Sequence, residues 1–433
     1  MKILFVGFKN RSSFLFTAPI IEYILLNSGG YKMQSFDILA NFKYLSELIN
    51  GKEFMDLYCQ STSHNINIYA LSPFYLAYKE IHYVFSKNDL RSFFYALKNA
   101  LNKSIMFFLF FIKFSIRVRK LQLKYKIFTP RQLFHNVYYN NVLIHGTNDT
   151  AAKCLISDLK DIIPSTSRVI WLPHAPHHGS INQKMPSVLV KYQAKVEIWL
   201  PSENENISDS TSNIKVFNSG YPPFSSTSLN KIRRTIDKIE SNSTVLLLRQ
   251  YKNQSDPTNY FLSKKEILTI LRLIKDYQKL YESKKLYICP HPSINIKELE
   301  TIIKSVDIQN IYIGSRYFLN YVGRNSLIIG SYSTVLLHAA LLGLRTICLN
   351  DSIINYLRTN EPILYSLYVS YPLILVEPYL KDIVTALSKF RDTHFDDFLN
   401  DPRFLSSSLY RTAVFSAEAS MRCASNLFEK PCY

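Results

Sequence analysis

The strongest constraint on the fold is a pattern that occurs twice: short apolar runs that each lead into a polar loop and then a helix-like segment. The first run, residues 1–8, is almost continuously apolar, and a helix-like stretch follows at 14–27. Residues 36–130 are rich in aromatic side chains and mostly helical by pattern. Strand-like runs return at 141–144, 168–172 and 196–200. Because continuous apolar runs suit strands buried on both faces, and strands that alternate with helices suit a parallel sheet, we predict the α/β class.

A second alternation follows a break in the middle of the chain. The break is the segment VFNSGYPPF at 216–224, whose glycine and two prolines favour the end of regular structure. Beyond it, strands are predicted at 245–249, 286–289, 326–329 and 346–349, and helices at 263–280, 296–304 and 333–342. We therefore predict two Rossmann-like domains, 1–222 and 241–390, whose parallel sheets face a central cleft. A linker is predicted at 223–240, and a helical tail at 391–433 that packs back on the first domain.

The charge of the chain points to anionic partners. Its 51 Lys and Arg residues exceed its 33 Asp and Glu residues, which gives a net charge of +18. Such an excess concentrates anions near the surface and favours acidic lipids or polyanions. No nucleic-acid-binding motif accompanies it, so we expect no nucleic acid partner. The six cysteines form no CxxC pair, which favours a reduced, cytoplasmic protein without a disulfide framework or a zinc site.

One segment suggests contact with a membrane. Residues 105–126 join the most apolar run, IMFFLFFI, to a basic stretch. The apolar part is too short to span a bilayer, which needs about 20 residues, so we expect no transmembrane helix. The N-terminus has no signal-peptide cleavage site and has the pattern of a strand instead. An apolar stretch with a basic end can lie in the membrane interface, which predicts peripheral association with the inner membrane. A buried helix with a basic exit is the alternative.

Two predicted strand ends in the second domain carry polar side chains. His291 follows the strand LYIC and lies between prolines, of which Pro292 is itself a candidate substrate-binding residue. A fixed imidazole at that edge can donate a hydrogen bond to a phosphate or to a leaving nucleotide, although a plain turn histidine fits as well. Ser331, Ser333 and Thr334 follow the strand SLII and open a helix. Hydroxyls and backbone amides at a helix start form an anion site, and plain N-capping is the alternative. Both strand ends belong to one sheet, so we expect them side by side.

These two motifs carry a resemblance to a known group of enzymes. YICPHPSI followed by GSYSTVLLHAALLG resembles the HP and Ser/Ser-Thr motifs of bacterial sialyltransferases and polysialyltransferases, and is similar to related Kdo transferases and CDP-glycerol glycerophosphotransferases. The resemblance covers about residues 216–350. It implies the GT-B fold, no metal and no cofactor. It also implies that His291 contacts the donor phosphate or the cytidylate leaving group, and that Ser333 and Thr334 hold the same phosphate.

The first domain is expected to bind the acceptor and to supply the base. WLPHAPHHGS places His174, His177 and His178 just after a predicted strand, and it is similar to the strand-end His-Gly segment of the glycerophosphotransferases, whose histidine acts as base. His174 is the first choice because it is nearest the strand, and a histidine pKa of about 6.5 suits a base. His177 and His178 are candidates for binding the substrate. A metal site is the rival interpretation of the three histidines, and a purely structural role for at least two of them is a further alternative. The acidic base motif of the sialyltransferases is absent, and Asp149 is its nearest substitute, although it can equally cap a helix.

One further cation completes the predicted site. Arg249 ends the first strand of the second domain and can neutralise a phosphate or an acceptor carboxylate, whereas a merely solvated arginine is the alternative.

Together these residues predict an inverting, metal-independent glycosyltransferase. We expect it to move an acidic sugar (sialic acid, another nonulosonic acid or Kdo) from a CMP-linked donor to a capsule or lipopolysaccharide glycan, which can itself be anionic. A CDP-glycerol-type polyol phosphotransferase is the alternative enzyme. A non-catalytic polyanion-binding protein is the alternative from another class, and it rests on charge alone.

Overall fold

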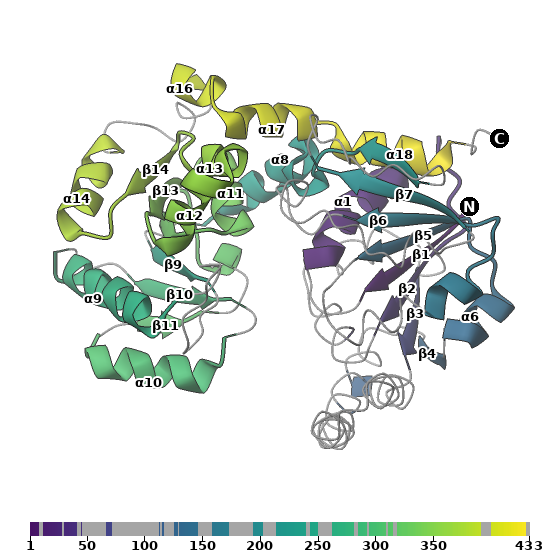
Figure 1. Cartoon of the computed structure of the whole chain (residues 1–433), viewed down its shortest axis with the longest axis horizontal. Helices are drawn as coiled ribbons and strands as arrows, with labels where there is room; N and C mark the ends of the chain where they lie inside the picture. Colours follow the sequence, from purple (N-terminus) through teal and green to yellow (C-terminus); the bar gives the residue numbers. More distant parts are fainter. Residues whose placement is uncertain are drawn as a thin grey trace. The chain divides into compact units, whose positions relative to one another are not determined.

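A computed structural model gives the fold as two compact units. It describes residues 1–7, 12–27, 30–40, 45, 66–71, 112, 115–116, 125–128, 130–145, 158–172, 194–201, 214–239, 243–249, 262–280, 285–291, 294–308, 311–314, 318–390 and 400–429. Unit 1 consists of Met1–Pro223 together with Glu418–Tyr433, and unit 2 is Phe224–Ala417. Each unit contains one parallel sheet, which Figure 1 shows with its helices.

The sheet of unit 1 has the strand order β4-β3-β2-β1-β5-β6-β7-β8. Its strands are β1 (Lys2–Gly7), β2 (Ser35–Ala40), β3 (Ile66–Leu71), β4 (Tyr125–Phe128), β5 (Asn141–His145), β6 (Arg168–Leu172), β7 (Lys195–Leu200) and β8 (Ile214–Asn218). Every neighbouring pair is parallel. The central strands are apolar on both faces because helices cover both sides of a parallel sheet. The chain order reverses between β1 and β5, which makes this the switch point of the sheet.

The expectation of a mostly helical stretch at 36–130 is wrong for its described residues, because they include strands β2, β3 and β4. Strand β2 contains Asp37, which is 1% exposed and which helix-like patterning does not anticipate. Its carboxylate accepts hydrogen bonds from Tyr139 Oη at 2.6 Å and Asn67 Nδ2 at 2.8 Å. Burial raises the pKa of Asp37, while these donors act in the opposite direction. A charge inside a strand is thus compensated by side chains from other strands and loops.

Helices α1 (Ser12–Leu26), α6 (Pro130–Asn136) and α18 (Ala419–Phe428) belong to unit 1. Helix α18 comes from the far end of the chain and lies beside α1 (Figure 1). A partly buried ion pair between Arg168 of β6 and Glu197 of β7, 2.5 Å apart, lies against it. Arg168 Nη1 donates to the Asn426 carbonyl at 2.6 Å, and Arg168 Nη2 also donates to the Asn426 side chain. The last helix is therefore fastened to the first sheet by specific polar bonds.

Unit 2 has the strand order β11-β10-β9-β12-β13-β14, and every pair is parallel. Its strands are β9 (Thr244–Leu248), β10 (Leu286–Pro290), β11 (Ile311–Ile313), β12 (Leu327–Gly330), β13 (Arg345–Leu349) and β14 (Leu373–Val376). Numbered within the unit, this is the order 3-2-1-4-5-6 of a Rossmann fold. Two Rossmann-like units in one chain are the components of a GT-B fold, so the predicted α/β class and its two parallel sheets are confirmed.

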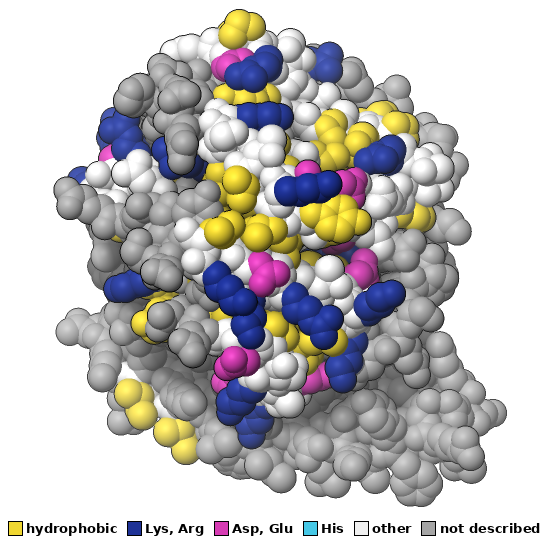
Figure 2. All heavy atoms as spheres, turned by 90° about the vertical axis from the view of Figure 1, so that its left-hand side faces the viewer, with side chains coloured by type: hydrophobic (Ala, Val, Ile, Leu, Met, Phe, Trp, Pro, Cys, Tyr) yellow, Lys and Arg dark blue, Asp and Glu magenta, His cyan; other side chains and the backbone are white. Residues whose placement is uncertain are grey.

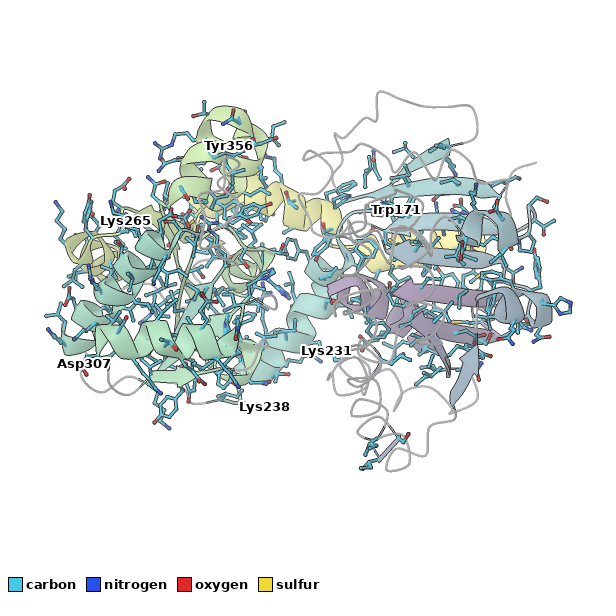
Figure 3. The ribbon with its side chains drawn as sticks, turned by 60° about the horizontal axis from the view of Figure 1, so that its bottom comes forward. Trp171, Lys231, Lys238, Lys265, Asp307 and Tyr356 are labelled. Carbon is cyan, nitrogen blue, oxygen red and sulfur yellow. The ribbon has the colours of Figure 1, made fainter. Side chains whose placement is uncertain are left out.

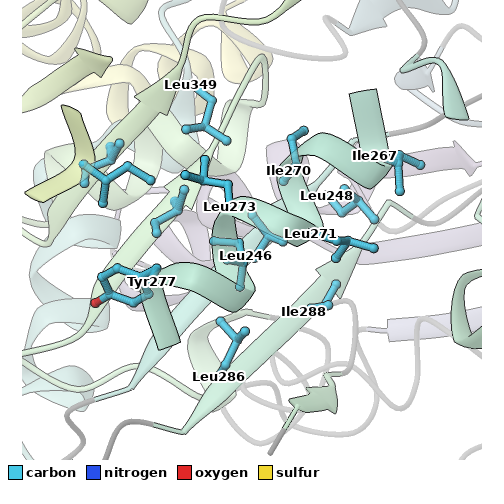
Figure 4. Close-up of a cluster of buried hydrophobic side chains, with 14 of the residues drawn as sticks. Leu246, Leu248, Ile267, Ile270, Leu271, Leu273, Tyr277, Leu286, Ile288 and Leu349 are labelled. Carbon is cyan, nitrogen blue, oxygen red and sulfur yellow. The ribbon is translucent and has the colours of Figure 1, made fainter. Parts of the chain in front are cut away.

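One face of this sheet is covered by α9 (Lys264–Leu280), α10 (Ile296–Val306) and α14 (Leu380–Lys389). Their apolar side chains pack on Leu246, Leu248, Leu286 and Ile288 of the sheet, as Figure 4 shows for the part around α9. The apolar residues of α9 recur with helical periodicity. They place Ile267, Leu271 and Ile274 in this core, where each is fully buried. Helices α11 (Thr334–Leu341), α12 (Ser352–Asn360) and α13 (Pro362–Tyr368) follow the strands on the other side of β9.

Residues 223–240, which the sequence predicts to be a linker, contain helix α8 (Ser226–Ile236). Its N-cap is Ser225, whose hydroxyl accepts from the Ser228 backbone N–H, so a polar serine-rich stretch here starts a helix. Lys231 on this helix and Lys238 just beyond it are labelled in Figure 3. The predicted tail 391–433 is divided between the units: α16 (Pro402–Leu405) and α17 (Ser408–Ser416) belong to unit 2, and α18 belongs to unit 1.

Candidate functional site

The polar side chains of unit 2 gather at the carboxyl ends of its strands. Arg249 follows β9, His291 follows β10, Ser331 follows β12, Asn350 follows β13 and Glu377 follows β14. The chain order reverses between β9 and β12, and open parallel sheets bind ligands at the carboxyl edge of such a switch point. The candidate site is therefore the edge that begins at these two strands.

Helix α11 starts at this edge with neutral residues. Gly330 allows its close approach, since a Cβ there would meet Leu247 Cβ at 3.1 Å and Leu336 Cδ1 at 3.3 Å. Ser333 is the N-cap, and its hydroxyl accepts from the Val335 backbone N–H at 3.2 Å. Thr334 is the first helical residue, and the first turn contains no acidic side chain. The positive end of the helix dipole is thus not neutralised by any carboxylate of its own helix.

The hydroxyl of Ser331 lies just before this helix start and is buried. Ser331 is 5% exposed, and its Oγ has no hydrogen-bond partner in the described structure. Tyr368 of α13 is close by, with its ring 5.5 Å from the ring of Tyr332. Burial raises the pKa of the Tyr368 phenol well above its ordinary range. A buried hydroxyl without a partner is uncommon in folded proteins, so the Ser331 hydroxyl has hydrogen-bonding capacity that no described residue uses.

His291 is exposed at the end of β10, and its backbone is fixed on both sides. Its N–H donates to the Leu248 carbonyl of β9 at 2.7 Å, and its carbonyl accepts from the Ile294 N–H at 2.9 Å. These bonds hold the residue in a turn at the carboxyl edge, where its imidazole is accessible to solvent.

The expectation that the His-Pro turn and the Ser/Thr segment lie side by side is wrong in detail. Strand β9 lies between β10 and β12, so Arg249 separates the two motifs. The reason is the doubly wound topology, in which the first strand of the unit occupies the centre of the sheet and later strands add on either side.

Arg249 is not a solvated arginine, because it is only 7% exposed. Its guanidinium is bound to other residues of the protein. Its Nε donates to Asp351 Oδ2 at 3.0 Å, in an ion pair whose two side chains are each 5% exposed. Its Nη2 donates to Ser352 Oγ at 3.2 Å. Phosphate binding by Arg249 would compete with this buried pair.

Asp351 and Glu266 close the start of the neighbouring helix, α12. Asp351 is its N-cap, and its Oδ1 accepts from the N–H groups of Ile353 and Ile354 at 3.2 and 3.3 Å. Glu266 Oε1 accepts from the Ser352 N–H at 3.3 Å. Burial raises the pKa of Glu266, but its hydrogen bonds to Ser352 and Ser263 outweigh that effect and leave the pKa lowered. Two carboxylates thus already occupy this helix terminus.

Sequence reasoning missed a second polar pair on this edge, Asn350 and Glu377. Asn350 is 6% exposed, its Nδ2 donates to Glu377 Oε1 at 2.5 Å, and its Oδ1 has no partner in the described structure. Strand β14, which carries Glu377, was not predicted, so the sequence offered no reason to place the two residues together. A polar residue directly after the predicted strand 346–349 was the available signal.

His338, on the last turn of α11, is a buried histidine that the sequence analysis did not single out. Its ring lies 5.6 Å from that of Phe224, and Nε2 has no hydrogen-bond partner in the described structure. Burial, and then the charge of Arg233, lower its pKa to about 4. Arg233 Nη2 donates to the Leu341 carbonyl at 2.5 Å, which caps the C-terminus of the same helix. His338 is therefore a neutral part of the packing.

Several predicted site residues lie outside the described residues, namely Asp149, His174, His177, His178 and Pro292. The predicted membrane-interface segment 105–126 lies almost wholly outside them as well. Among the helices that are described, none has the length and apolar character needed to cross a membrane. On the face of unit 2 shown in Figure 2, Lys and Arg side chains are scattered among acidic and hydrophobic ones rather than gathered into one basic patch.

Comparison with known proteins gives structural likenesses only. No protein-family model matches the chain, and no curated protein matches its sequence. The UDP-GlcNAc 2-epimerase of Neisseria meningitidis bound to UDP-GlcNAc is similar with a TM-score of 0.45 and 14% identity, over 99% of this chain and 100% of that one. The S. aureus MnaA–UDP structure gives 0.48 and 11%, over 100% and 99%. The wall teichoic acid polymerase TagF gives 0.44 and 10%, over 99% and 88%. At these scores and identities the likenesses say nothing about the reaction of this chain.

Proposed function

We propose that unit 2 binds the phosphate of a nucleotide-linked donor at the start of α11, and that the protein is an inverting, metal-independent glycosyltransferase. The proposed donor is a CMP-linked acidic sugar, and the proposed acceptor is a bacterial capsule or lipopolysaccharide glycan. The donor and acceptor assignments rest on the resemblance of the His-Pro and Ser/Thr motifs, together with the positive net charge.

The observation that carries the proposal is the start of α11 at the switch point of the Rossmann-like sheet. There a helix begins with a neutral N-cap, and the buried Ser331 hydroxyl has no partner in the described structure. A helix N-terminus attracts negative charge, and a hydroxyl beside it can donate to a phosphate oxygen. The start of α12 offers no such place, because Asp351 and Glu266 already accept from its N–H groups.

In the proposed reaction, a base from unit 1 takes the proton of an acceptor hydroxyl, and the hydroxyl oxygen attacks the anomeric carbon. The bond from that carbon to the phosphate oxygen breaks, and its electron pair leaves with the nucleotide. Charge develops on the phosphate, so donors fixed in advance around it lower the barrier. We assign this role to Ser331, Ser333, Thr334 and His291. His174 or Asp149 remains the proposed base, as predicted from the sequence.

A cytoplasmic protein attached to the inner membrane surface is the setting that fits this proposal. The support is the basic, aromatic segment 105–126 and the +18 charge, which both favour anionic lipid or an anionic glycan. A polyol phosphotransferase that uses a CDP-linked donor is the second candidate, and the segment WLPHAPHHGS favours it.

Isothermal titration with CMP, CDP and UMP tests the proposal. We expect micromolar binding of at least one nucleotide, and we expect Ser331→Ala and His291→Ala each to weaken it by about tenfold, the loss of a hydrogen bond to a charged group. Ser388→Ala is the matched control, because Ser388 is exposed on α14 and bonds to the carbonyl of Thr385 in its own helix. A preference for CDP favours the phosphotransferase. No binding of any nucleotide, with tight and salt-sensitive binding of polyanions, overturns the enzyme assignment.

A further inference from the structure

The pair Asn350–Glu377 lies next to the proposed phosphate site but has a different chemistry. Both residues follow strands on the α11 side of the sheet, in the order β12-β13-β14. The Asn350 N–H donates to the Val376 carbonyl at 2.8 Å, so the backbone ladder between β13 and β14 continues through Asn350. Both side chains are thereby attached to a rigid part of the sheet.

The carboxylate determines which way the amide of Asn350 is turned. A carboxylate oxygen can only accept, so the group 2.5 Å from Glu377 Oε1 must be the amide nitrogen. The amide oxygen is then the atom left over, and it has no partner in the described structure. Because Asn350 is only 6% exposed, an unused acceptor here carries a free-energy cost until a donor reaches it.

Glu377 offers a second acceptor in the same place. Its side chain is exposed, and no Lys, Arg or His of the described residues forms an ion pair with it. The pair thus presents acceptors that no cation of the described structure neutralises, beside a helix start that favours anions.

A phosphate cannot satisfy these acceptors, because a deprotonated phosphate offers acceptors as well and carries the same sign of charge as Glu377. Hydroxyl groups can, since each donates one hydrogen bond. Neighbouring strands are about 4.8 Å apart, so the backbones of the strands that lead to Asn350 and Glu377 lie about 5 and 10 Å along the edge from the strand that leads to Ser331. Hydroxyls on a group esterified to the phosphate span that distance.

We propose that Asn350 and Glu377 form a hydroxyl-binding subsite, which accepts hydrogen bonds from a vicinal diol on the group attached to the phosphate. The diol belongs either to the ribose of the nucleotide or to the transferred sugar or polyol. The proposal rests on the phosphate site proposed above and extends it along the same edge of the sheet.

Two matched pairs of ligands test the subsite by isothermal titration. CMP is compared with 2′,3′-dideoxy-CMP, and glycerol 3-phosphate is compared with n-propyl phosphate, so that each pair differs only in hydroxyls. We expect the diol member of at least one pair to bind about tenfold more tightly, as for a hydrogen bond to a charged acceptor. Discrimination in the first pair identifies the ribose, and discrimination in the second identifies the transferred group.

Variants assign that discrimination to the subsite. Glu377→Ala removes the charged acceptor and should abolish the preference for the diol, while the ligand without hydroxyls binds as tightly as before. Glu377→Gln keeps an acceptor for Asn350 and should retain part of the preference. Glu300→Gln, an exposed carboxylate on α10, is the control and should change nothing. Thermal unfolding of each variant checks that the fold is retained.

The outcomes separate this proposal from the proposed function. If none of the four ligands binds, the phosphate site itself fails. If phosphate ligands bind and Ser331→Ala weakens them, but the diol makes no difference in either pair, the phosphate site stands and the subsite is overturned. A diol preference that survives Glu377→Ala also overturns the subsite.

Discussion

Helices α11 and α12 begin after adjacent strands of the same sheet, yet their N-termini are arranged in opposite ways. The start of α12 is filled by two carboxylates, Asp351 and Glu266, and Arg249 neutralises the first of them. The start of α11 has a serine cap and a buried hydroxyl without a partner in the described structure. The same backbone geometry thus serves internal stability at the start of α12, whereas no described carboxylate occupies the start of α11, where we propose that a phosphate binds.

The largest expected effect comes from a substitution at the start of α12, which Asp351 and Glu266 occupy. Asp351→Asn keeps an N-cap acceptor but removes the charge that neutralises the buried guanidinium of Arg249. We expect the free energy of unfolding to fall by about 3–5 kcal/mol, as for other buried ion pairs that lose one partner. Urea unfolding measures it. Asp276→Asn removes the exposed ion pair between Asp276 and Lys279 and should cost less than about 1 kcal/mol. Equal losses of unfolding free energy in the two variants would contradict the difference expected between a buried and an exposed ion pair.

Next in size is a pH effect within α11 itself. The pKa of His338 is lowered from 6.5 to about 4, so the unfolded chain binds its proton before the folded protein does. Stability is therefore complete above pH 6.5 and is lost as the pH falls from 6.5 to 4, by up to about 3 kcal/mol at 1.36 kcal/mol per pKa unit. Urea unfolding at pH 7 and pH 4 measures this loss. His338→Gln should remove that part of the pH dependence, and an unchanged slope would argue against a buried neutral histidine.

Two serine variants test the start of α11, which no carboxylate of its own helix occupies. Ser333→Ala removes the N-cap of α11 and should lower the free energy of unfolding by about 1 kcal/mol. Ser331→Ala removes a hydroxyl that has no partner in the described structure, so stability should stay within about 0.5 kcal/mol while nucleotide binding weakens. Urea unfolding and titration with CMP measure the two effects. A marked destabilisation by Ser331→Ala would mean that this hydroxyl has a structural role.

The smallest expected effect is the acid dependence of stability that Glu266 contributes at the start of α12. The lowered pKa of Glu266 means that its contribution is present above its ordinary pKa of 4.5 and is lost as the pH falls below that value. Glu266→Gln should therefore flatten the stability profile below pH 4.5 and leave it unchanged between pH 4.5 and 6.5. Acid titration followed by circular dichroism distinguishes this step from that of His338.

The sequence predicts those parts of the fold that depend on local pattern. The strand at 168–172 and the helix start at Ser333 both agree with the structure, because apolar runs and N-cap residues act over a few neighbouring positions. The strand order of unit 2 does not follow from any local pattern, and it places β9 between the two motifs. Asp351, which neutralises Arg249, stands 102 residues further along the chain.

Residues 36–130 and the Asn350–Glu377 pair show the same limit in physical terms. Asp37 interrupts the apolar run of strand β2, and it fits there because Asn67 and Tyr139, the latter 102 residues away, donate to it. Asn350 meets Glu377 because β13 and β14 are neighbours, and β14 has four residues and only a weak pattern of its own. Polar groups whose partners are distant in sequence are therefore the hardest to predict, and one such pair, Asn350 and Glu377, lies at the edge that contains the candidate site.

The hydrogen bonds between α18 and the sheet of unit 1 have a consequence for the order in which the two units fold during synthesis. Unit 1 contains Met1–Pro223, but the bonds from Arg168 to Asn426 require residues that follow unit 2 in the chain. The strands of unit 1 therefore emerge long before their final helix is available, while all of unit 2 is synthesised in between. The order of synthesis and the order of completion are reversed, so unit 2 can finish folding first, and the N-terminal sheet must wait for a helix that is synthesised after unit 2.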